Sequence, residues 1–146
     1  MPSTHTPLGV ELMVTGENAG TWGTKTNTNL NIIEQISAGY VSQAVNGTGA
    51  TTLAVSDGAT GATLATRVIV LTGTITGNIT VTIPIDVENW YFIKNGTSGA
   101  YTVEFKYVSG SGSSFTWTAA QKDWRVLYAA ADDGTNPNIS EIGLTT

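Results

Sequence analysis

The sequence predicts a mainly β protein, an antiparallel β-sandwich or jelly-roll-like domain with an N-terminal extended arm and one short helix. Three observations support this class. Short apolar segments recur about every ten residues after position 41, glycine-rich turns separate them, and one earlier segment has helical spacing instead. Antiparallel strands joined in this way are typical of sandwiches. We therefore expect residues 1–40 to form an assembly element and residues 41–146 to form a β-sandwich domain.

The chain is expected to begin as an arm. Residues 1–8 hold two prolines and no apolar periodicity, which is typical of an extended segment without structure of its own. In residues 10–14, Val10, Leu12 and Val14 alternate with other side chains, a pattern that predicts a short strand. The glycines of residues 16–23 are expected to let Trp22 fold back and dock its ring.

A helix is predicted to follow this loop. Four apolar residues recur at spacings of three and four and form one stripe: Leu30, Ile33, Ile36 and Tyr40. Thr28 or Asn29 is the expected N-cap, and Gly39 is expected to end the helix in the left-handed conformation. Asn31 and Gln35 are predicted to face away from the stripe. A helix of about a dozen residues is marginal by itself, so the stripe must pack against the downstream sheet or a neighbouring copy.

The remaining chain is predicted as strands at residues 41–45, 51–55, 68–71, 79–83, 90–94, 101–108, 115–118 and 123–129, followed by a weakly alternating tail. Asn46-Gly47 and Asn95-Gly96 are typical hairpin turns, so residues 41–55 are expected to form a hairpin or neighbouring strands, and residues 90–108 a hairpin. Pro84 is expected to end its strand. Most aromatic residues at this spacing belong in a core, and Tyr91 or Trp117 is expected to remain as a surface anchor.

Composition excludes several classes of function. The chain has no cysteine, which rules out disulfides, thiolate metal sites and a cysteine nucleophile. Its six basic residues are scattered and its net charge is −5, which argues against a nucleic-acid partner. The first residues do not form a signal peptide, and no apolar run has the length of a membrane span, so no membrane partner is expected. Only 12% of residues are charged, about half the usual share, which favours stabilisation through packing and association.

The candidate catalytic groups do not form a convincing site. His5 is the sole histidine and lies in the arm, whereas a catalytic base must be held rigidly against its nucleophile. Asp86 and Glu88 could flank a glycosidic bond, but an acidic pair at a strand-to-strand bend is more often an ordinary turn. We therefore expect no catalytic residues and no enzymatic activity.

Ligand loops are equally weak. Residues 16–26 have glycines and a Thr-Lys-Thr run, but their spacing differs from that of a phosphate-binding loop. In such a loop four residues separate a first glycine from a Gly-Lys-Ser/Thr run. Here Asn18 occupies the place of the first glycine, and Thr24 separates Gly23 from Lys25. Asp57-Gly58 and Asp132-Asp133-Gly134 are acidic turns without the spacing of a calcium loop. The sequence predicts no cofactor and no metal site.

Two stretches resemble a known group of proteins. GENAGTWGTKTNTNLNIIEQISAGY is similar to the N-terminal G-x-W-G-x-x-x-N-x-N segment of tailed-bacteriophage virion structural proteins, with Gly16, Gly20, Trp22, Gly23, Asn27 and Asn29 all present. The stretch from VIVLTGTITGNITVTIP to WRVLYAAADDGTN resembles the β-domain that follows this segment in such proteins. The resemblance implies a structural virion role, usually in oligomers, with trimers common.

Within that family the chain is expected to be a capsid decoration (cement) protein, because no long repetitive shaft follows the β-segment. The alternative is a tail-associated or fibre-base protein, with host-receptor or glycan binding. The expected partners are further copies, as a trimer, and other virion proteins, either the major capsid protein or tail proteins, in a virion assembled in the host cytoplasm. The residues expected to mediate assembly are Gly16, Gly20, Trp22, Gly23, Asn27, Asn29, Leu30, Ile33 and Ile36. Whether they act within one subunit or between copies stays open.

Overall fold

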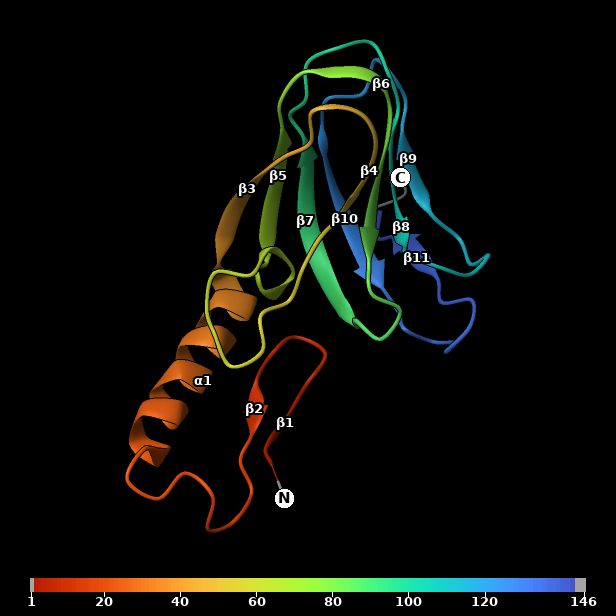
Figure 1. Ribbon diagram of the computed structural model, residues 1–146. Helices are drawn as coiled ribbons and strands as arrows, with labels where there is room; N and C mark the ends of the chain where they lie inside the picture. The colour runs from red at the N-terminus through yellow and green to blue at the C-terminus, as the bar shows by residue number, and fades with distance from the viewer. Residues whose placement is uncertain (1, 144–146) are drawn as a thin grey trace.

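The computed structural model describes residues 2–143 and is mainly β, with two packed sheets, a small arm hairpin and one α-helix within these residues (Figure 1). Residue 1 of the predicted arm and residues 144–146 of the predicted tail lie outside this range. The elements are β1 (Thr4–His5), β2 (Glu11–Leu12), α1 (Trp22–Ala38), β3 (Tyr40–Ala44), β4 (Gly47–Thr52), the 3₁₀ turn η1 (Thr63–Ala65), β5 (Val68–Thr72), β6 (Ile75–Ile83), β7 (Asn89–Asn95), β8 (Val103–Tyr107), β9 (Phe115–Trp117), β10 (Trp124–Ala129) and β11 (Ile139–Glu141).

The two large sheets contain both parallel and antiparallel pairs. The five-stranded sheet has the order β11-β10-β7-β5-β3, and the four-stranded sheet has the order β4-β6-β8-β9. Neighbours within β3-β5-β7 and within β4-β6-β8 are parallel, whereas β9, β10 and β11 pair antiparallel. The mainly β class is therefore confirmed, but the expectation of antiparallel pairing throughout is wrong.

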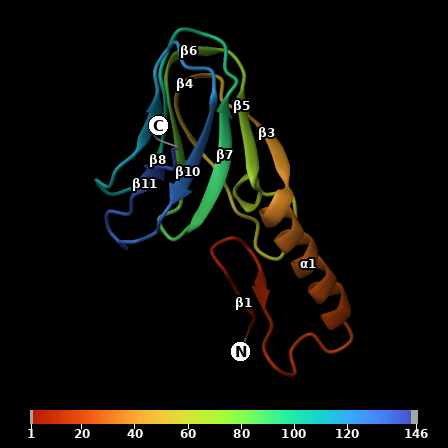
Figure 2. The same cartoon turned by 180° about the vertical axis from the view of Figure 1, so that it is seen from behind.

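The parallel pairs arise because the chain alternates between the sheets. A strand of the five-stranded sheet is followed by a strand of the four-stranded sheet, and we call each such pair a coil: β3-β4, β5-β6 and β7-β8. From the second coil to the third, partners lie 24 residues apart, as in Val68 with Phe92 and Ile79 with Val103. The coils stack, and β9, β10 and β11 close one end of the stack (Figures 1 and 2).

Both predicted hairpins are consequently wrong, because their turns bind neighbouring coils: the Asn46-Gly47 turn binds the following coil, and the Asn95-Gly96 turn binds the preceding one. The Asn46 side chain accepts a hydrogen bond from the Thr74 amide at 3.1 Å. The Gly96 amide donates to the Leu71 carbonyl at 2.8 Å, and the Ser98 amide donates to the Gly73 carbonyl at 2.9 Å. Each Asn-Gly turn thus carries the chain from one sheet to the other.

The core fills the space between the two sheets, and strand alternation decides which residues enter it. The buried set includes Ile69, Leu71, Ile93, Leu127, Val81, Ile83, Val103, Phe105 and Tyr107. Tyr91 and Trp117, the expected surface anchors, are both 0% exposed, so that prediction is wrong. The Tyr91 hydroxyl donates to the Leu64 carbonyl at 2.9 Å, which satisfies its polar end. Burial raises the pKa of Tyr91 above its ordinary value.

The helix is longer than predicted and presents a different face. It begins at Trp22, so Thr28 and Asn29 lie inside it rather than at the cap, and Gly39 is extended (φ −68°) rather than left-handed. A Cβ at Gly39 would overlap the Gln35 carbonyl, which explains the glycine by close approach instead.

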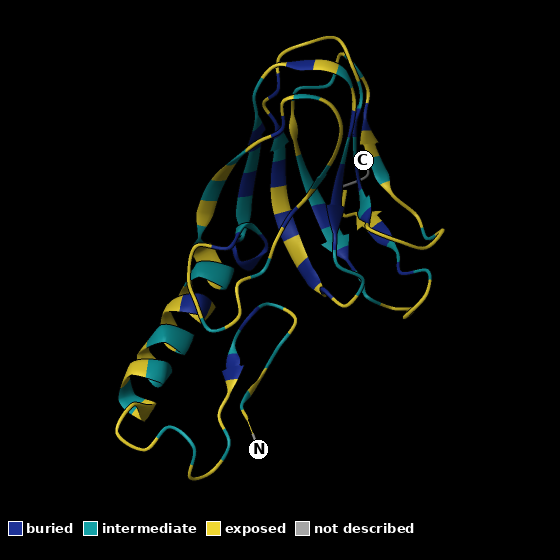
Figure 3. Cartoon of the chain, viewed as in Figure 1, coloured by how far each residue is buried: buried dark blue, intermediate teal, exposed yellow. Residues whose placement is uncertain are grey.

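The face of α1 that meets the domain is centred on Ile32, which is 0% exposed, whereas Leu30 and Ile33 are 56% and 50% exposed. Gln35, predicted to face away, lies on the inner side, where its amide nitrogen donates to the carbonyls of Ala62 and Ala65. The carbonyls of Ala62 and Ala65 accept from this amide, which explains a polar residue on the side of the helix that meets the domain. Figure 3 shows exposed, intermediate and buried positions along the helix.

In the predicted strand of the arm, the polar residue is buried and the neighbouring apolar residues are exposed. Its strand β2 pairs antiparallel with β1 and covers Glu11–Leu12 only. Glu11 is 6% exposed, whereas Leu12 and Met13 are 52% and 40% exposed. The buried side of the arm is therefore polar, and the reason lies in its contact with the helix.

Candidate assembly surface

Asn29 fastens the arm to the helix. Its Oδ1 accepts a hydrogen bond from the Glu11 amide at 2.9 Å, and its Nδ2 donates to the Glu11 carbonyl at 2.8 Å. One side-chain amide thus satisfies both backbone groups of Glu11, as a neighbouring strand would. An asparagine side chain suits this position of the helix because it carries both the acceptor and the donor that the two bonds need.

The Glu11 carboxylate adds an ion pair to this junction. Lys25, one helical turn before Asn29, approaches it at 2.9 Å, and Asn18 donates to it at 3.5 Å. The Glu11 side chain is only 5% exposed. The hydrogen bond from Lys25 holds the pKa of Glu11 below its ordinary value, against the opposing effect of burial. We call Glu11, Asn18, Lys25 and Asn29 the arm clasp.

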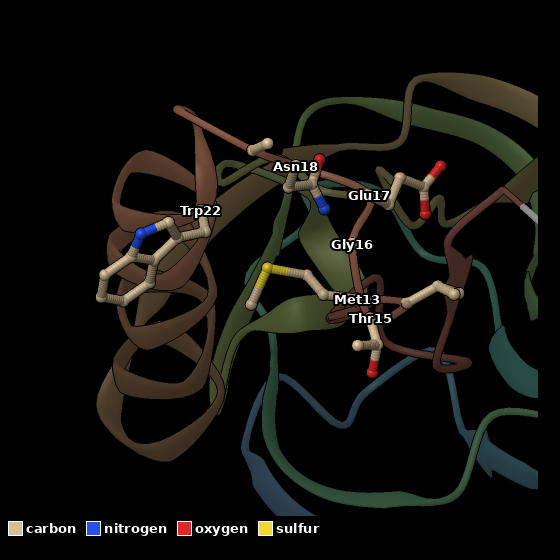
Figure 4. Close-up of a pocket in the computed structure, with 8 residues that line it drawn as sticks. Met13, Thr15, Gly16, Glu17, Asn18 and Trp22 are labelled. Carbon is tan, nitrogen blue, oxygen red and sulfur yellow. The ribbon is translucent and has the colours of Figure 1, made fainter.

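The loop between arm and helix depends on two glycines. Gly16 and Gly20 have φ of +82° and +83°, the left-handed region that favours glycine. The loop borders a shallow pocket of about 330 Å³ whose lining includes Met13, Gly16 and Trp22 (Figure 4). The Trp22 ring is 65% exposed, so it does not dock within the described chain as predicted.

The nine predicted assembly residues divide into three groups. Gly16, Gly20 and Asn29 build the loop and the arm clasp described above. Trp22, Leu30 and Ile33 are exposed on the outer side of the helix. Gly23, Asn27 and Ile36 complete the set: Gly23 and Ile36 are partly buried and Asn27 is exposed. No described atom lies within 4 Å of the position that a Cβ of Gly23 would take, and the structure gives no reason for a glycine there.

The outer side of the helix carries a stripe that continues to the sheet. Trp22, Leu30, Ile33 and Tyr40, which we call the helix stripe, are all at least half exposed. Tyr40 is the first residue of β3, and in register it lies beside Val68 of β5. Val68 lies beside Phe92, and Phe92 beside Val126. One apolar row therefore crosses four strands and meets the helix stripe at Tyr40.

The outer side of the five-stranded sheet is rich in exposed aromatic rings. Trp90, Phe92 and Trp124, which we call the aromatic face, are 42%, 37% and 49% exposed. Arg67 stacks at 4.1 Å from the centre of the Trp90 ring, and Lys94 lies 5.8 Å from that of Trp124. These cations hold the rings against the sheet while their exposed surfaces remain apolar.

Sequence reasoning missed the aromatic face and the arm clasp. Both alternating phases of β7 are apolar, since Tyr91 and Ile93 point into the core and Trp90 and Phe92 point out, so periodicity could not choose between them. The sequence did contain a signal for the parallel stacking of the coils, because residues 79–83 align with residues 103–107 at an offset of 24 residues. The sequence signal for the arm clasp was limited to Glu11, a charged residue inside a short alternating segment.

The opposite sheet has a different outer surface. Its outward positions on β6 and β8 are polar, and include Thr80, Glu104 and Lys106. Thr52 and Thr82 bond to each other across β4 and β6 at 2.8 Å. The protein therefore has one aromatic side and one threonine-rich, charged side.

The titratable groups in residues 2–143 are spread apart. Within this range no three His, Asp or Glu side chains are grouped so that they could hold a metal ion. Asp86 and Glu88 are exposed on either side of buried Val87, and the Tyr128 hydroxyl donates to Glu88 at 3.0 Å. His5 lies 3.9 Å from Asp57 at the side of the arm. In the same part of the chain, α1 lacks the length and apolar character needed to cross a bilayer.

The chain was compared with family models, curated proteins and solved structures, and no match was found in any of the three.

Proposed function

We propose that this protein is a structural subunit of a bacteriophage particle, first of all a capsid decoration protein, that binds neighbouring subunits through the helix stripe and the aromatic face. The observation that carries the proposal is the continuity of these two surfaces at Tyr40. Contiguous exposed apolar surface of this kind marks sites of protein association. The resemblance of residues 16–40 to phage virion proteins supplies the biological setting.

The size of the surface suits several contacts rather than one. Seven large side chains belong to the helix stripe and the aromatic face, each between 37% and 65% exposed. Burying the exposed half of such a side chain contributes about 1 kcal/mol, so the whole surface contributes about 7 kcal/mol. Association costs about 4–15 kcal/mol in lost freedom. The surface must therefore be buried almost completely, as in an oligomer seated on a larger shell.

The first test is the mass of the protein in solution. Light scattering on the wild type is expected to give a homo-oligomer, and Trp22→Ala is expected to lower its mass without changing the unfolding of the sheets. Thr116→Ala, at an exposed position of β9 in the other sheet, is the control. A wild-type single chain, or equal masses for both variants, would overturn the role of the helix stripe.

The second test is location. A reconstruction of purified particles is expected to show this fold on the capsid surface, with the aromatic side toward the shell. Density at the tail would favour the alternative, a tail-associated or fibre-base protein. Absence of the protein from purified particles would sink both assignments.

Glycan binding is a second candidate function, because Trp90 and Trp124 are exposed on the outer side of one sheet with Arg67 and Lys94 beside them. Sugar rings stack on aromatic faces, and cationic side chains can donate to their hydroxyls. A glycan array with wild type and Trp124→Ala tests this candidate. Binding that Trp124→Ala abolishes while the oligomer mass is unchanged supports it, and no binding at high protein concentration removes it.

A further inference from the structure

The stack of coils has one closed end and one open end. At the closed end the outermost strands, β9 and β11, are three residues long each. At the open end the outermost strands are β3, with five residues, and β4, with six. Neither β3 nor β4 has a neighbouring strand on its outer side within residues 2–143. Two long strand edges, one in each sheet, therefore lie together at the same end of the molecule (Figures 1 and 2).

These edges lack the protection that edge strands usually carry. Natural edges are shortened, or carry charges or proline, so that they do not pair with other chains. Residues 40–52 contain no charged residue and no proline. At the closed end, by contrast, Glu141 of β11 forms an ion pair with Arg125 at 2.7 Å. The irregularity between Gly47 and Gly49 is confined to the start of β4.

Side chains already cover the core at the open end, so the part left available for pairing there is the backbone of β3 and β4. Gln43, which points inward opposite Leu71, accepts a hydrogen bond from the Thr63 hydroxyl at 3.0 Å. Leu64 of η1 is 0% exposed and joins the core. Apart from Tyr40 at the start of β3, the outward side chains of the edges are small, as at Ser42, Ala44 and Ala50, and all three are exposed. Another backbone can therefore approach closely.

We propose that the open end binds a second copy of this chain through a two-fold axis perpendicular to the sheets, with β3 pairing antiparallel to its counterpart and β4 to its counterpart. A single foreign strand could occupy only one of the two edges. A second copy carries both edges at the same separation, and rotation about this axis brings each edge against itself. Such self-complementary contacts are the usual form of a two-fold interface. Both sheets then continue through the pair of molecules.

The proposed axis also determines how the aromatic faces of the two copies are placed. Rotation perpendicular to the sheets keeps each sheet in its own layer, so the aromatic faces of the two copies lie on the same side. The proposed pairing would thus join two aromatic faces into one wide apolar surface. The pairing itself does not depend on the proposed function, because it uses the backbone edges of β3 and β4 rather than the side chains of the helix stripe, of which only Tyr40 belongs to β3.

The absence of cysteine from the sequence makes a direct test possible. Ser42 is the central residue of β3, so in the antiparallel pair it faces its own counterpart. Ser42→Cys and Ala50→Cys, treated with a short bis-maleimide at low protein concentration, are each expected to give a covalent dimer of twice 15.2 kDa. Ser140→Cys, on the edge strand of the closed end, is the matched control and is expected to stay uncrosslinked.

Light scattering completes the test. The mass of Ser42→Lys is expected to be lower than that of the wild type, because two lysines would meet at the axis, whereas Ser140→Lys is expected to keep the wild-type mass. Circular dichroism checks that each variant is folded. Equal crosslinking at Ser42→Cys and Ser140→Cys would overturn the proposal. So would a wild-type single chain, or a mass that grows without limit with concentration, which indicates head-to-tail stacking.

Discussion

The Asn29→Ala substitution tests the arm clasp most directly. Asn29 makes two hydrogen bonds, at 2.9 and 2.8 Å, to the amide and carbonyl of Glu11. Alanine removes both and leaves two backbone groups of a residue that is 6% exposed without these partners. The arm hairpin, rather than the sheets, should lose stability, because its other described backbone bond to the domain joins the Gly58 amide to the Gly9 carbonyl at 2.7 Å.

The magnitude follows from the number of bonds. A hydrogen bond of this kind contributes about 1 kcal/mol net, so the two together contribute about 2 kcal/mol to docking of the arm. Every 1.4 kcal/mol is a factor of ten in an equilibrium constant, so the open form of the arm is expected to rise about 30-fold.

Hydrogen exchange measured by mass spectrometry reads this change out. Peptides covering residues 4–12 are expected to exchange about 30-fold faster in Asn29→Ala, while peptides from β6 and β7 keep their protection. Asn27→Ala is the matched control, because Asn27 belongs to the same sequence motif but is exposed. Equal exchange in wild type and Asn29→Ala, or equal acceleration in both variants, would refute the clasp.

Three further predictions concern other parts of the molecule. The pKa of Glu11 is lowered in the folded protein, so its ion pair stabilises the docked arm at a pH above the ordinary pKa of 4.5, and this stabilisation is lost as the pH falls through the lowered pKa. Proteolysis of the arm should therefore rise in acid, and Glu11→Gln should remove this pH dependence. Ile32→Ala is expected to lower the free energy of unfolding in urea by about 3 kcal/mol because Ile32 is fully buried, whereas Leu30→Ala should change it by under about 0.5 kcal/mol. Gly99→Ala, at φ +108° and in overlap with a carbonyl of the preceding coil, should cost about 1–3 kcal/mol in the same assay, and Gly134→Ala, where a Cβ meets open space in the described chain, should be neutral.

Local patterns in the sequence predicted most of the strands, because alternation within a strand is a local property. Residues 68–71 and 79–83 fall inside β5 and β6, and residues 90–94 inside β7. The pairing of these strands was mispredicted because Asn-Gly is a hairpin signal only when the flanking strands belong to one sheet. Here each turn bonds to a neighbouring coil, which no local rule detects.

The helix shows a second limit of local reasoning. Apolar spacing predicted a stripe with Leu30 and Ile33 that packs against the sheet or a neighbouring copy, yet the side of α1 that meets the domain is set by what it contacts, namely the carbonyls of Ala62 and Ala65 and the backbone of the arm. Those partners are met by Gln35 and Asn29, which are polar and were therefore placed outside or at a cap. The nine predicted assembly residues include Asn29, which holds the arm, and three members of the helix stripe; their role in assembly stays a prediction.

The stacking of the coils implies that this molecule could vary in length without redesign. In the parallel stack each strand pairs only with the strands directly on either side of it. A duplicate of residues 68–91 inserted after position 91 would add one strand to each sheet and leave the arm, the helix and the closing strands unaltered. Each added coil would move the closed end about 4.8 Å further from the arm. The stack of coils is thus a spacer between the arm and helix at one end and the closing strands at the other.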